Sequence, residues 1–409
     1  MIEPKLRFKK DDGSDFPDWE EKKLGDVCDT LTYGMNAAAV KFDGENKYIR
    51  ITDIDDESHC YKNDELVSPD GELDNKYLVC ENDILLARTG ASVGKSYLYN
   101  KEDGKLYYAG FLIKAHVKSE NSKFIFFQTL TERYDKWVKI TSMRSGQPGI
   151  NANEYSDFTM NVPSLPEQQK IADFLSTIDT IIEKQRATVS AWEERKKGVM
   201  QKLFSQEVRF KADDGSDFPD WEEKKINDIA TCFAGATPST KIPEYWEDGT
   251  IQWMSSGEVN NGQIFETEKR ISKLGFDKCS TKMVKPNTVV IALAGQGKTR
   301  GMVAITRISL CTNQSLCAIE TNTDICDDYL YQYLQLQYNN LRLISSGDGT
   351  RGGLNLKLIG NYSVSIPSLS EQQKIADCLS ALDTVIEKQK ETLEKWQELK
   401  KGLLQQMFV

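Results

Sequence analysis

Apolar residues recur at alternating spacings of three and four in two segments, 163–204 and 367–408. The segments align without gaps and share 26 of 42 residues. This spacing is typical of a helix that buries one stripe against a partner helix. A glutamine and a lysine interrupt both stripes at matching places. The apolar positions are Leu175, Ile178, Ile182, Val189, Trp192, Val199 and Leu203 in the first segment, and Leu379, Leu382, Ile386, Leu393, Trp396, Leu403 and Met407 in the second.

Each of these segments predicts one long helix. Pro166 stands at an early helical position, and Ser370 with Gln373 forms a capping-box pattern. At 1.5 Å per residue each helix would be roughly 55–60 Å long. Because a whole folded insert separates the two segments, the helices can meet antiparallel as a coiled coil. The alternative is that each helix packs only on its own domain.

Between the helices the pattern changes to short apolar runs. "DILLAR" (83–88) and "TVVIAL" (288–293) predict buried strands. Further strands are expected over 106–117 and 301–308, and helices over 124–140 and 327–344. Glycine-rich stretches follow, "SMRSGQPGINANEY" and "SSGDGTRGGLNLKLI". Each insert therefore predicts an α+β domain with polar loops, where recognition side chains tend to lie.

A second repeat precedes each insert. "RFKKDDGSDFPDWEEKKLGDV" (7–27) returns as "RFKADDGSDFPDWEEKKINDI" (209–229), with 17 of 21 positions identical. The inserts that follow, 28–162 and 230–366, are almost unrelated. The period of about 200 residues is too long for a solenoid, so it indicates a duplicated domain-plus-helix unit.

Composition fits a globular protein of two to three domains, with 39% hydrophobic and 28% charged residues among 409. We expect a cytoplasmic protein without a membrane segment, because no apolar run approaches ~20 residues and no secretory signal begins the chain. The nine cysteines show no CxxC spacing, and we expect them to be reduced and mostly buried, Cys80, Cys311 and Cys317 among them. The two histidines, His59 and His116, are expected to be structural or surface residues.

The net charge of −10 by itself argues against a nucleic-acid-binding protein. The charge is unevenly distributed, however. Residues 269–307 carry nine Lys/Arg against one acidic residue, and residues 84–118 carry six against two. Basic stretches at related places in both halves are less typical of a merely solvated surface.

"ALAGQGKT" (292–299) nearly has the spacing of a phosphate-binding P-loop. That loop needs a helix after it, whereas "RGMVAITRI" alternates like a strand, and the related "RTGASVGKS" of the first half is one residue short. We therefore interpret both as basic hairpin turns in which the Gly-Lys-Thr and Gly-Lys-Ser positions match.

Other motifs of catalysis are weak. "PDWEEK" (17–22 and 219–224) has the residue types of a PD…ExK nuclease, but one residue separates its Asp from the Glu-x-Lys, so we interpret it as a helix start or turn. "NVPS" and "SIPS" lack the second proline and the aromatic residue of an amino-methyltransferase loop. No GxSxG or HExxH occurs. The sequence predicts neither a catalytic residue nor a metal site.

The organisation resembles the specificity (S) subunit of type I restriction–modification systems. The resemblance lies in "PSLPEQQKIA" and "PSLSEQQKIA", "WEEKKLGDV" and "WEEKKINDI", "GATPST…YWEDGTIQWMSSGEV", "VVIALAGQGKTRGMVA" and "GGLNLKLIGNYSVSIPSLSEQ". The first insert keeps "NDILLARTGASVGKS" but has "YGMNAAAV" where a G-x-T-P-S pattern would stand.

This resemblance implies two pseudo-symmetric target-recognition domains, 1–162 and 209–366, separated by two spacer helices, 163–208 and 367–409, that form an antiparallel coiled coil. It implies a non-catalytic subunit that recognises a bipartite site in double-stranded DNA and directs other subunits to it. Its partners would be two methyltransferase (M) subunits and endonuclease/translocase (R) subunits. S-adenosylmethionine, ATP and Mg²⁺ would belong to those partners, and this chain would hold no cofactor.

Within that resemblance, polar and basic side chains of the glycine-rich loops are the candidates for DNA contact, because Arg suits guanine edges and Asn or Gln adenine edges. In the first domain they are Arg88, Thr89, Ser92, Lys95, Ser96, Arg144, Gln147 and Asn151. In the second domain they are Ser239, Lys241, Gln296, Lys298, Thr299, Arg300, Asn313, Gln314, Arg351 and Asn355.

Two other functions stay open at the level of sequence. A two-domain scaffold that binds proteins through a coiled-coil spacer predicts no sequence-selective shift of DNA in a gel. A P-loop hydrolase predicts ATP turnover that is lost in Lys298→Ala.

Overall fold

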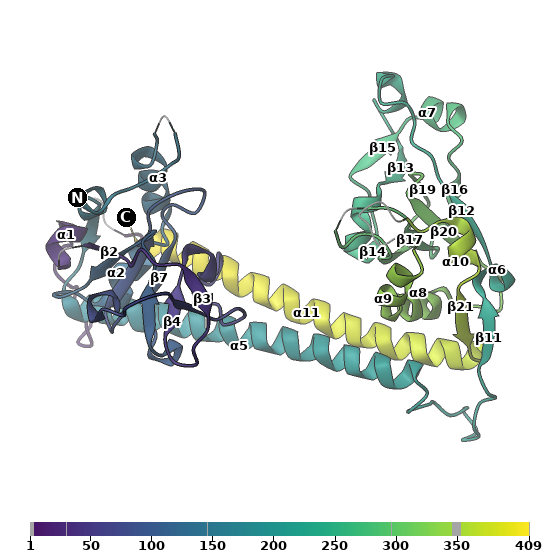
Figure 1. Cartoon of the computed structure of the whole chain (residues 1–409), viewed down its shortest axis with the longest axis horizontal. Helices are drawn as coiled ribbons and strands as arrows, with labels where there is room; N and C mark the ends of the chain where they lie inside the picture. The colour runs from purple at the N-terminus through teal and green to yellow at the C-terminus, as the bar shows by residue number, and fades with distance from the viewer. Residues whose placement is uncertain (1–3, 30, 145, 296, 346–352, 409) are drawn as a thin grey trace. The chain divides into compact units, whose positions relative to one another are not determined.

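The computed structural model describes residues 4–29, 31–144, 146–295, 297–345 and 353–408 (Figure 1). The chain forms two compact units. The first comprises residues 1–187 and 391–409, and the second comprises residues 188–390. Each unit therefore contains one 21-residue repeat, one insert and one half of each long helix.

The first unit is built around a four-stranded sheet in the order β2-β9-β6-β7, with the small pairs β3-β5 and β4-β8 beside it. Its strands are β1 (Glu20–Lys23), β2 (Thr32–Tyr33), β3 (Ala39–Lys41), β4 (Lys47–Ile49), β5 (Val67–Pro69), β6 (Asp83–Ala87), β7 (Ser96–Leu98), β8 (Leu106–Tyr108), β9 (Leu112–His116) and β10 (Thr159–Val162). Its helices are α1 (Leu24–Val27), α2 (Ser122–Gln128), α3 (Glu132–Thr141) and α4 (Ala152–Ser156), with 3-10 turns at Ile51–Asp53, Asn75–Tyr77 and Lys101–Asp103.

The second unit has a five-stranded sheet, β12-β20-β17-β18-β14, and a four-stranded sheet, β15-β13-β19-β16. Its strands are β11 (Glu222–Lys225), β12 (Ala230–Ala234), β13 (Ile251–Met254), β14 (Gln263–Ile264), β15 (Lys269–Ile271), β16 (Met283–Val284), β17 (Val289–Ala292), β18 (Val303–Thr306), β19 (Leu310–Thr312), β20 (Leu316–Thr321) and β21 (Ser363–Ile366). Its helices are α6 (Ile226–Ile229), α7 (Lys273–Lys278), α8 (Asp327–Leu336), α9 (Tyr338–Leu343) and α10 (Leu356–Gly360), with 3-10 turns at Pro243–Tyr245 and Ser256–Asn261.

The predicted helices and strands of the inserts are interrupted by turns. Thr131 caps α3 by accepting from the Tyr134 N–H, so the helix expected over 124–140 is two helices. The run over 106–117 likewise folds as two strands, β8 and β9, with a turn between them. Cys80 lies in an exposed turn rather than in the core, whereas Cys311 and Cys317 are buried as expected.

The "EEKK" residues of each 21-residue repeat form a strand, β1 or β11, and not the helix start or turn that the sequence predicts. Each strand pairs antiparallel with the last strand of the insert, so that Glu20 lies opposite Val162 and Glu222 opposite Ile366. The partner strand lies far along the chain, which is why the local pattern does not reveal it. The repeat thus closes each insert by joining its first and last residues.

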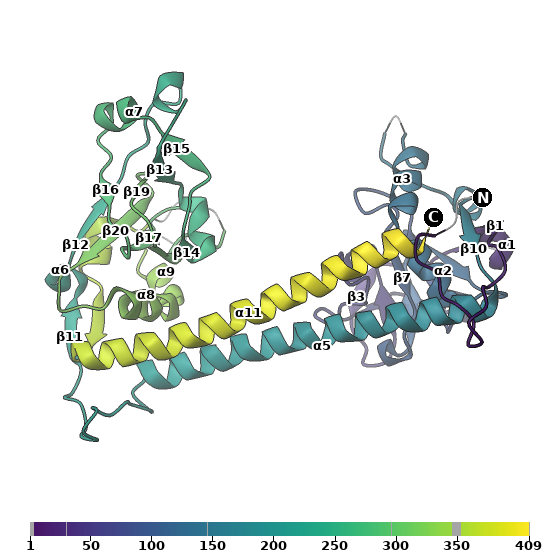
Figure 2. The ribbon, with the colours of Figure 1, turned by 180° about the vertical axis from the view of Figure 1, so that it is seen from behind.

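The long helices α5 (Leu165–Phe204) and α11 (Leu369–Met407) lie side by side (Figure 2). In the first unit Asp179 of α5 pairs with Lys400 of α11 at 2.6 Å. In the second unit Lys196 of α5 pairs with Asp383 of α11 at 2.5 Å. Later residues of one helix thus meet earlier residues of the other, so the helices are antiparallel. The lysine that interrupts each apolar stripe forms these ion pairs.

The predicted stripe faces the interior in both units. Buried members are Leu175, Ile178, Ile182, Val189, Leu203, Leu379, Ile386 and Met407, and the half-buried members are Trp192, Val199, Leu382, Leu393, Trp396 and Leu403. The expectation of α+β domains with two long antiparallel helices is therefore confirmed.

Each insert packs on the start of the helix that follows it and on the end of the other helix. In the first unit, Phe408 at the end of α11 lies 5.4 Å from Phe124, between ring centroids, in a core that also contains Ile171 and Leu175 of α5. In the second unit, Phe204 at the end of α5 lies 5.7 Å from Tyr329. These contacts give the insert and both helix halves of each unit one continuous core.

Candidate nucleic-acid interface

Four loops meet at one end of the five-stranded sheet of the second unit. Strands β12 and β17 end there, and β18 and β20 begin there, because Ala234 pairs with Cys317 and Ala292 with Leu316. The loops are 235–241, the β17–β18 turn 293–302, the β19–β20 turn 313–315, and the segment 353–355 before α10. They carry Ser239, Lys241, Lys298, Thr299, Arg300, Asn313, Gln314 and Asn355. Gln296 and Arg351 lie outside the described residues.

Hydrogen bonds hold these loops against one another. The Leu293 N–H donates to the Ser315 carbonyl at 2.8 Å, and the Leu354 N–H donates to the Leu293 carbonyl at 2.9 Å. A Cβ on Gly235 would lie 1.8 Å from the Thr312 carbonyl oxygen, so only glycine fits this close approach. The Thr237 hydroxyl donates to Gln314 Oε1 at 2.6 Å. The loops therefore form one connected surface.

Helix α9 fixes the backbone of the β17–β18 turn. The Tyr338 hydroxyl donates to the Lys298 carbonyl at 2.7 Å, and the Arg342 guanidinium donates to the Gly297 carbonyl at 2.8 Å. The Lys298 side chain itself is exposed. Strand β18 follows the turn where a P-loop would have a helix, which agrees with the predicted hairpin.

The first unit has the same arrangement around β6. The Arg88 N–H donates to the Phe111 carbonyl at 3.0 Å, and the Ile150 N–H donates to the Arg88 carbonyl at 2.9 Å. These bonds match the two that Leu293 makes in the second unit. A Cβ on Gly34 would lie 2.2 Å from the Ala109 carbonyl oxygen, as for Gly235. The turn 88–95, the turn 109–111 and the segment 147–151 thus form the corresponding surface.

Arg88 lies at the centre of this surface. Its guanidinium carbon is 5.0 Å from the centroid of the Tyr33 ring, a cation–π distance. The Tyr33 hydroxyl accepts from the Ala152 N–H at 3.1 Å, which fixes the ring. The Arg88 Nε is buried and has no hydrogen-bond partner among the residues that the structure describes. A buried donor of this kind is costly unless a ligand supplies an acceptor.

Lys95 and Ser96 lie in the interior of the first unit and do not reach this surface. Lys95 donates to the Ile54 carbonyl at 3.1 Å and forms an ion pair with Asp56. The Ser96 hydroxyl is 2.7 Å from that of Thr129 and fully buried. Both side chains are committed to protein partners, so we leave them out of the proposed interface.

The matching of Gly-Lys-Ser with Gly-Lys-Thr is wrong. The Gly94 N–H donates to the Ala87 carbonyl, and the Gly301 N–H donates to the equivalent Ala292 carbonyl, both at 2.9 Å. Gly94 therefore corresponds to Gly301, and Lys95 corresponds to the residue after it, Met302. The turn of the second unit is two residues longer, so its lysine lies in the exposed part of the turn.

The remaining candidates occupy the surface in different ways. Asn151 and Asn355 cap α4 and α10, accepting from the N–H groups of Glu154 and Leu358 at 3.0 and 2.9 Å. Asn313 accepts from the Ser315 N–H at 3.0 Å. Arg144 forms an ion pair with Glu154. Thr89 bridges to Gly149, Ser92 is half-buried in the turn, and Gln147 is exposed.

Sequence reasoning missed Tyr33, Phe111, Tyr338 and Arg342. Tyr33 and Phe111 present aromatic rings beside the candidate polar residues, and Tyr338 and Arg342 brace the turn from a helix. An aromatic residue next to a glycine, as in Tyr33-Gly34 and Gly110-Phe111, is the one signal that the sequence offers.

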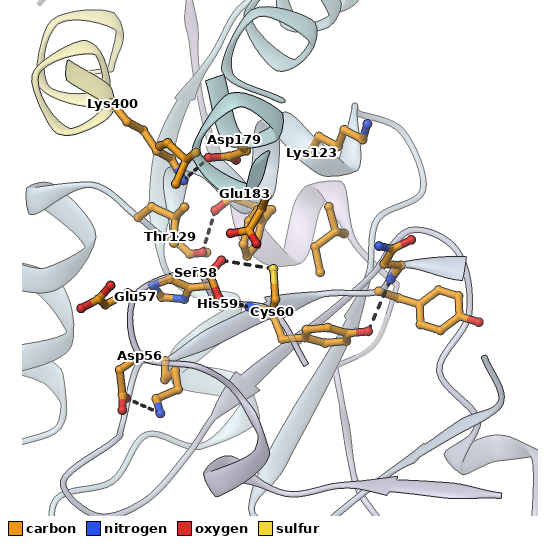
Figure 3. Close-up of a pocket in the computed structure, with 18 of the residues that line it drawn as sticks. Asp56, Glu57, Ser58, His59, Cys60, Lys123, Thr129, Asp179, Glu183 and Lys400 are labelled. Carbon is orange, nitrogen blue, oxygen red and sulfur yellow. Dashed lines mark hydrogen bonds and ion pairs between the residues drawn. The ribbon is translucent and has the colours of Figure 1, made fainter. Parts of the chain in front are cut away.

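A separate groove of about 1290 Å³ lies in the first unit between the insert and the long helices (Figure 3). The four labelled acidic residues around it are paired: Asp179 with Lys400, Asp56 with Lys95, and both Glu57 and Glu183 with Arg186 of α5, at 3.0 and 4.0 Å. Glu57 also accepts from Gln397 of α11 at 3.4 Å. The segment around residue 57 therefore braces the insert on both helices, which is a structural role.

His59 is half-buried at this groove, and its Nδ1 lies 2.9 Å from the Ser96 carbonyl. A carbonyl only accepts, so Nδ1 carries the proton and donates. Burial lowers the pKa of His59, and the nearby Lys400 and Lys95 add to this effect, while the Ser96 hydrogen bond and Asp135 oppose it. The neutral ring is therefore the form that the fold stabilises.

We expect the first unit to lose stability as the pH falls through about 6.5, the ordinary pKa of histidine. Between the folded and the unfolded pKa of His59 the unfolded chain binds more protons, so the free energy of unfolding decreases as the pH decreases. The melting temperature of His59→Gln should fall less between pH 7 and pH 5 than that of the wild type. Parallel curves for the two proteins would contradict this.

Within the described residues, no group of three or more His, Cys, Asp or Glu side chains is placed to hold a metal ion. Among the helices in that part of the chain, none is long and apolar enough to cross a membrane.

Comparison with known proteins follows the same division of the chain. The profile of the "Type I restriction modification DNA specificity domain" family matches twice, at residues 17–189 and 219–395. The MjaVIII type I restriction enzyme specificity subunit of Methanocaldococcus jannaschii is 26% identical over 410 residues, which covers 95% of this chain and 92% of that protein. The MjaIX specificity subunit of the same organism is 34% identical over 200 residues, 47% of this chain and 45% of that protein.

A solved structure has the same fold. The S subunit of a type I restriction–modification system from M. genitalium matches with a TM-score of 0.60 at 16% identity, covering 100% of this chain and 99% of that one. The two profile matches span most of the residues, and each contains one insert and the beginning of one long helix. The chain therefore belongs to the family of type I restriction–modification DNA specificity proteins, with two specificity domains in one polypeptide.

Proposed function

We propose that each insert reads one half of a bipartite DNA site and that the repeated parts of the chain bind partner subunits. The observation that carries this proposal is the contrast between repeat and insert. The same sheet end in both units presents two different sets of polar side chains, while the 21-residue repeat and the long helices are nearly copied. Two like surfaces suit two identical partners, and two unlike surfaces suit two different half-sites.

The partners would be two methyltransferase subunits and the endonuclease/translocase subunits of a type I system. S-adenosylmethionine, ATP and Mg²⁺ would be bound by those subunits, and this chain would contribute recognition without a chemical step. Its net charge of −10 fits this division. The loops carry the local positive charge, and much of the neutralisation of DNA phosphates would come from the partners.

Base edges and phosphates would be contacted by different side chains. Arg88 and Arg300 are the candidates for guanine edges, because each is half-buried in the turn that follows an inner strand of its sheet, β6 or β17. Lys298 is exposed in the same turn as Arg300 and suits a phosphate, which positions the protein without reading sequence.

Paired substitutions in the assembled enzyme test this proposal. We expect Arg88→Ala to relax or abolish recognition in one half-site and Arg300→Ala to do so in the other half-site only, each weakening specific binding by ~1–3 kcal/mol. Sequencing the methylated sites of each variant is the measurement. Lys298→Ala is the control, because loss of a phosphate contact should weaken binding to all duplexes alike. If both arginine variants left the methylated sequence unchanged, these assignments would be wrong.

A further inference from the structure

Phe111 occupies an unusual position in the turn between β8 and β9. Its side chain is 62% exposed, although Tyr108 before the turn and Leu112 after it are fully buried. The turn is held on both sides, because the Phe111 carbonyl accepts from the Arg88 N–H at 3.0 Å and the Gly110 N–H donates to the Met35 carbonyl at 2.8 Å. The ring is therefore kept in solvent by a fixed backbone.

The equivalent turn of the second insert presents a different chemistry. The carbonyls of Phe111 and Ser315 accept from equivalent N–H groups, those of Arg88 and Leu293. Beside Ser315, the exposed Gln314 presents an amide. At the same place in the two inserts, one turn thus offers a hydrogen-bonding group and the other an aromatic ring.

The surroundings of Phe111 belong to the proposed DNA-binding surface. The backbone N–H of Arg88 donates to the Phe111 carbonyl, and Tyr33, whose ring contacts the Arg88 guanidinium, is 42% exposed. Met143 is 71% exposed and follows Ser142 in the chain. The Ser142 carbonyl accepts from the Gly149 N–H at 3.1 Å, and Gly149 in turn forms a β-bridge with Thr89. Exposed apolar residues thus stand in three segments that hydrogen-bond or pack onto the loop that begins at Arg88, which gives this surface both charged and apolar groups.

We propose that Phe111 recognises a thymine in the first half-site through contact with the C5-methyl group. This methyl is the one apolar group that the four base pairs present in the major groove, and a phenylalanine ring is a known kind of partner for it. The inference deepens the proposed function and rests on it. It gives the first insert an apolar base contact in the turn where the second insert offers Gln314, one residue before the equivalent position Ser315.

The test removes the methyl from the DNA and the ring from the protein independently. The site is first mapped by sequencing methylated DNA, and each thymine of the first half-site is then replaced by uracil, which lacks only the methyl. With the chain assembled with its methyltransferase subunits, one such replacement should weaken binding by the wild type about three- to fivefold, the effect of one methyl-sized apolar contact. Binding by Phe111→Ala should be equally weak with thymine and with uracil.

Phe265→Ala is the matched control. Phe265 is 67% exposed in the second unit and follows β14, at the end of the sheet opposite to the loops. This variant should keep the full response to uracil. Melting curves of Phe111→Ala should match the wild type, because most of Phe111 is exposed to solvent.

The outcomes separate the two proposals. If the wild type selects the mapped site but every uracil replacement leaves its affinity unchanged, the inference about Phe111 is overturned and the proposed function stands. An undiminished uracil effect in Phe111→Ala, or a first half-site without an A·T pair, overturns it as well. If the assembled wild type shows no selective binding to any duplex, the proposed function itself fails.

Discussion

An enzyme assembled from methyltransferase subunits and a variant of this chain with one extra heptad in each long helix is expected to methylate sites whose halves lie about three base pairs farther apart. Seven residues lengthen a helix by about 10.5 Å, and successive base pairs are about 3.4 Å apart. The insertions belong after Ala187 and after Lys390, where the helices pass from one compact unit to the other. Sequencing the methylated sites of the variant is the measurement.

A heptad keeps the apolar stripe in register, and equal insertions in both helices preserve the pairs on either side. Asp179 would still face Lys400, and Lys196 would still face Asp383. A heptad in α5 alone is the control, because it shifts one helix against the other and should reduce methylation at every site. An unchanged gap in the double insertion would show that the helices do not set the separation of the half-sites.

Arg7→Ala is expected to destabilise the first unit by about 3–5 kcal/mol. Arg7 binds Glu167 with two hydrogen bonds, Nε to Oε1 at 3.1 Å and Nη2 to Oε2 at 2.9 Å, and it also donates to the Pro17 carbonyl at 2.8 Å. The Glu167 side chain is 0% exposed. Removal of the arginine would therefore leave a buried carboxylate without its counter-charge. Urea unfolding of the full chain measures the loss.

The duplication supplies an internal repeat of this experiment. Arg209 binds Glu371 in the same way, at 3.0 and 2.8 Å, and Glu371 is also 0% exposed, so Arg209→Ala should destabilise the second unit similarly. Lys170→Ala is the control. Its partner Asp11 is 96% exposed, so this pair contributes less than about 1 kcal/mol, and the hydrogen bond of Lys170 to the Lys9 carbonyl adds about 1 kcal/mol. If Arg7→Ala lowered the free energy of unfolding no more than Lys170→Ala does, the buried pair would not be what joins the repeat to the helix.

This pair gives the repeated residues a physical reason. The arginine begins the 21-residue repeat, and its carboxylate partner belongs to the "EQQ" that begins each long helix. Lys170 and Lys374 add bonds to the carbonyls of Lys9 and Lys211, both at 2.9 Å. The two repeats are therefore parts of one structural frame, although more than 150 residues separate them in the chain.

The sequence by itself determined the long helices, their apolar stripes and the duplicated organisation. Helical periodicity and repeat identity are properties of neighbouring residues and of copied strings, so they can be read without coordinates. The candidate loops were also found from local signals, since glycine-rich polar segments between apolar runs are rarely core. The buried strands 83–87 and 289–292 were likewise predicted from a local signal, a short continuous apolar run.

Only the tertiary structure decided which loop residues share a surface. Lys95 and Ser96 match a motif in sequence, yet Ser96 pairs with Leu86 and its hydroxyl is buried against Thr129, while Lys95 bonds to the Ile54 carbonyl and to Asp56. The register of a strand is set by hydrogen bonds to strands that are distant in sequence. The turn of the second unit is two residues longer, so the Gly-Lys-Thr motif stands at a different place relative to the strands than Gly-Lys-Ser does in the first unit. The Arg7–Glu167 pair, the Arg88–Tyr33 stack and the exposed ring of Phe111 depend on such long-range packing, which no local pattern encodes.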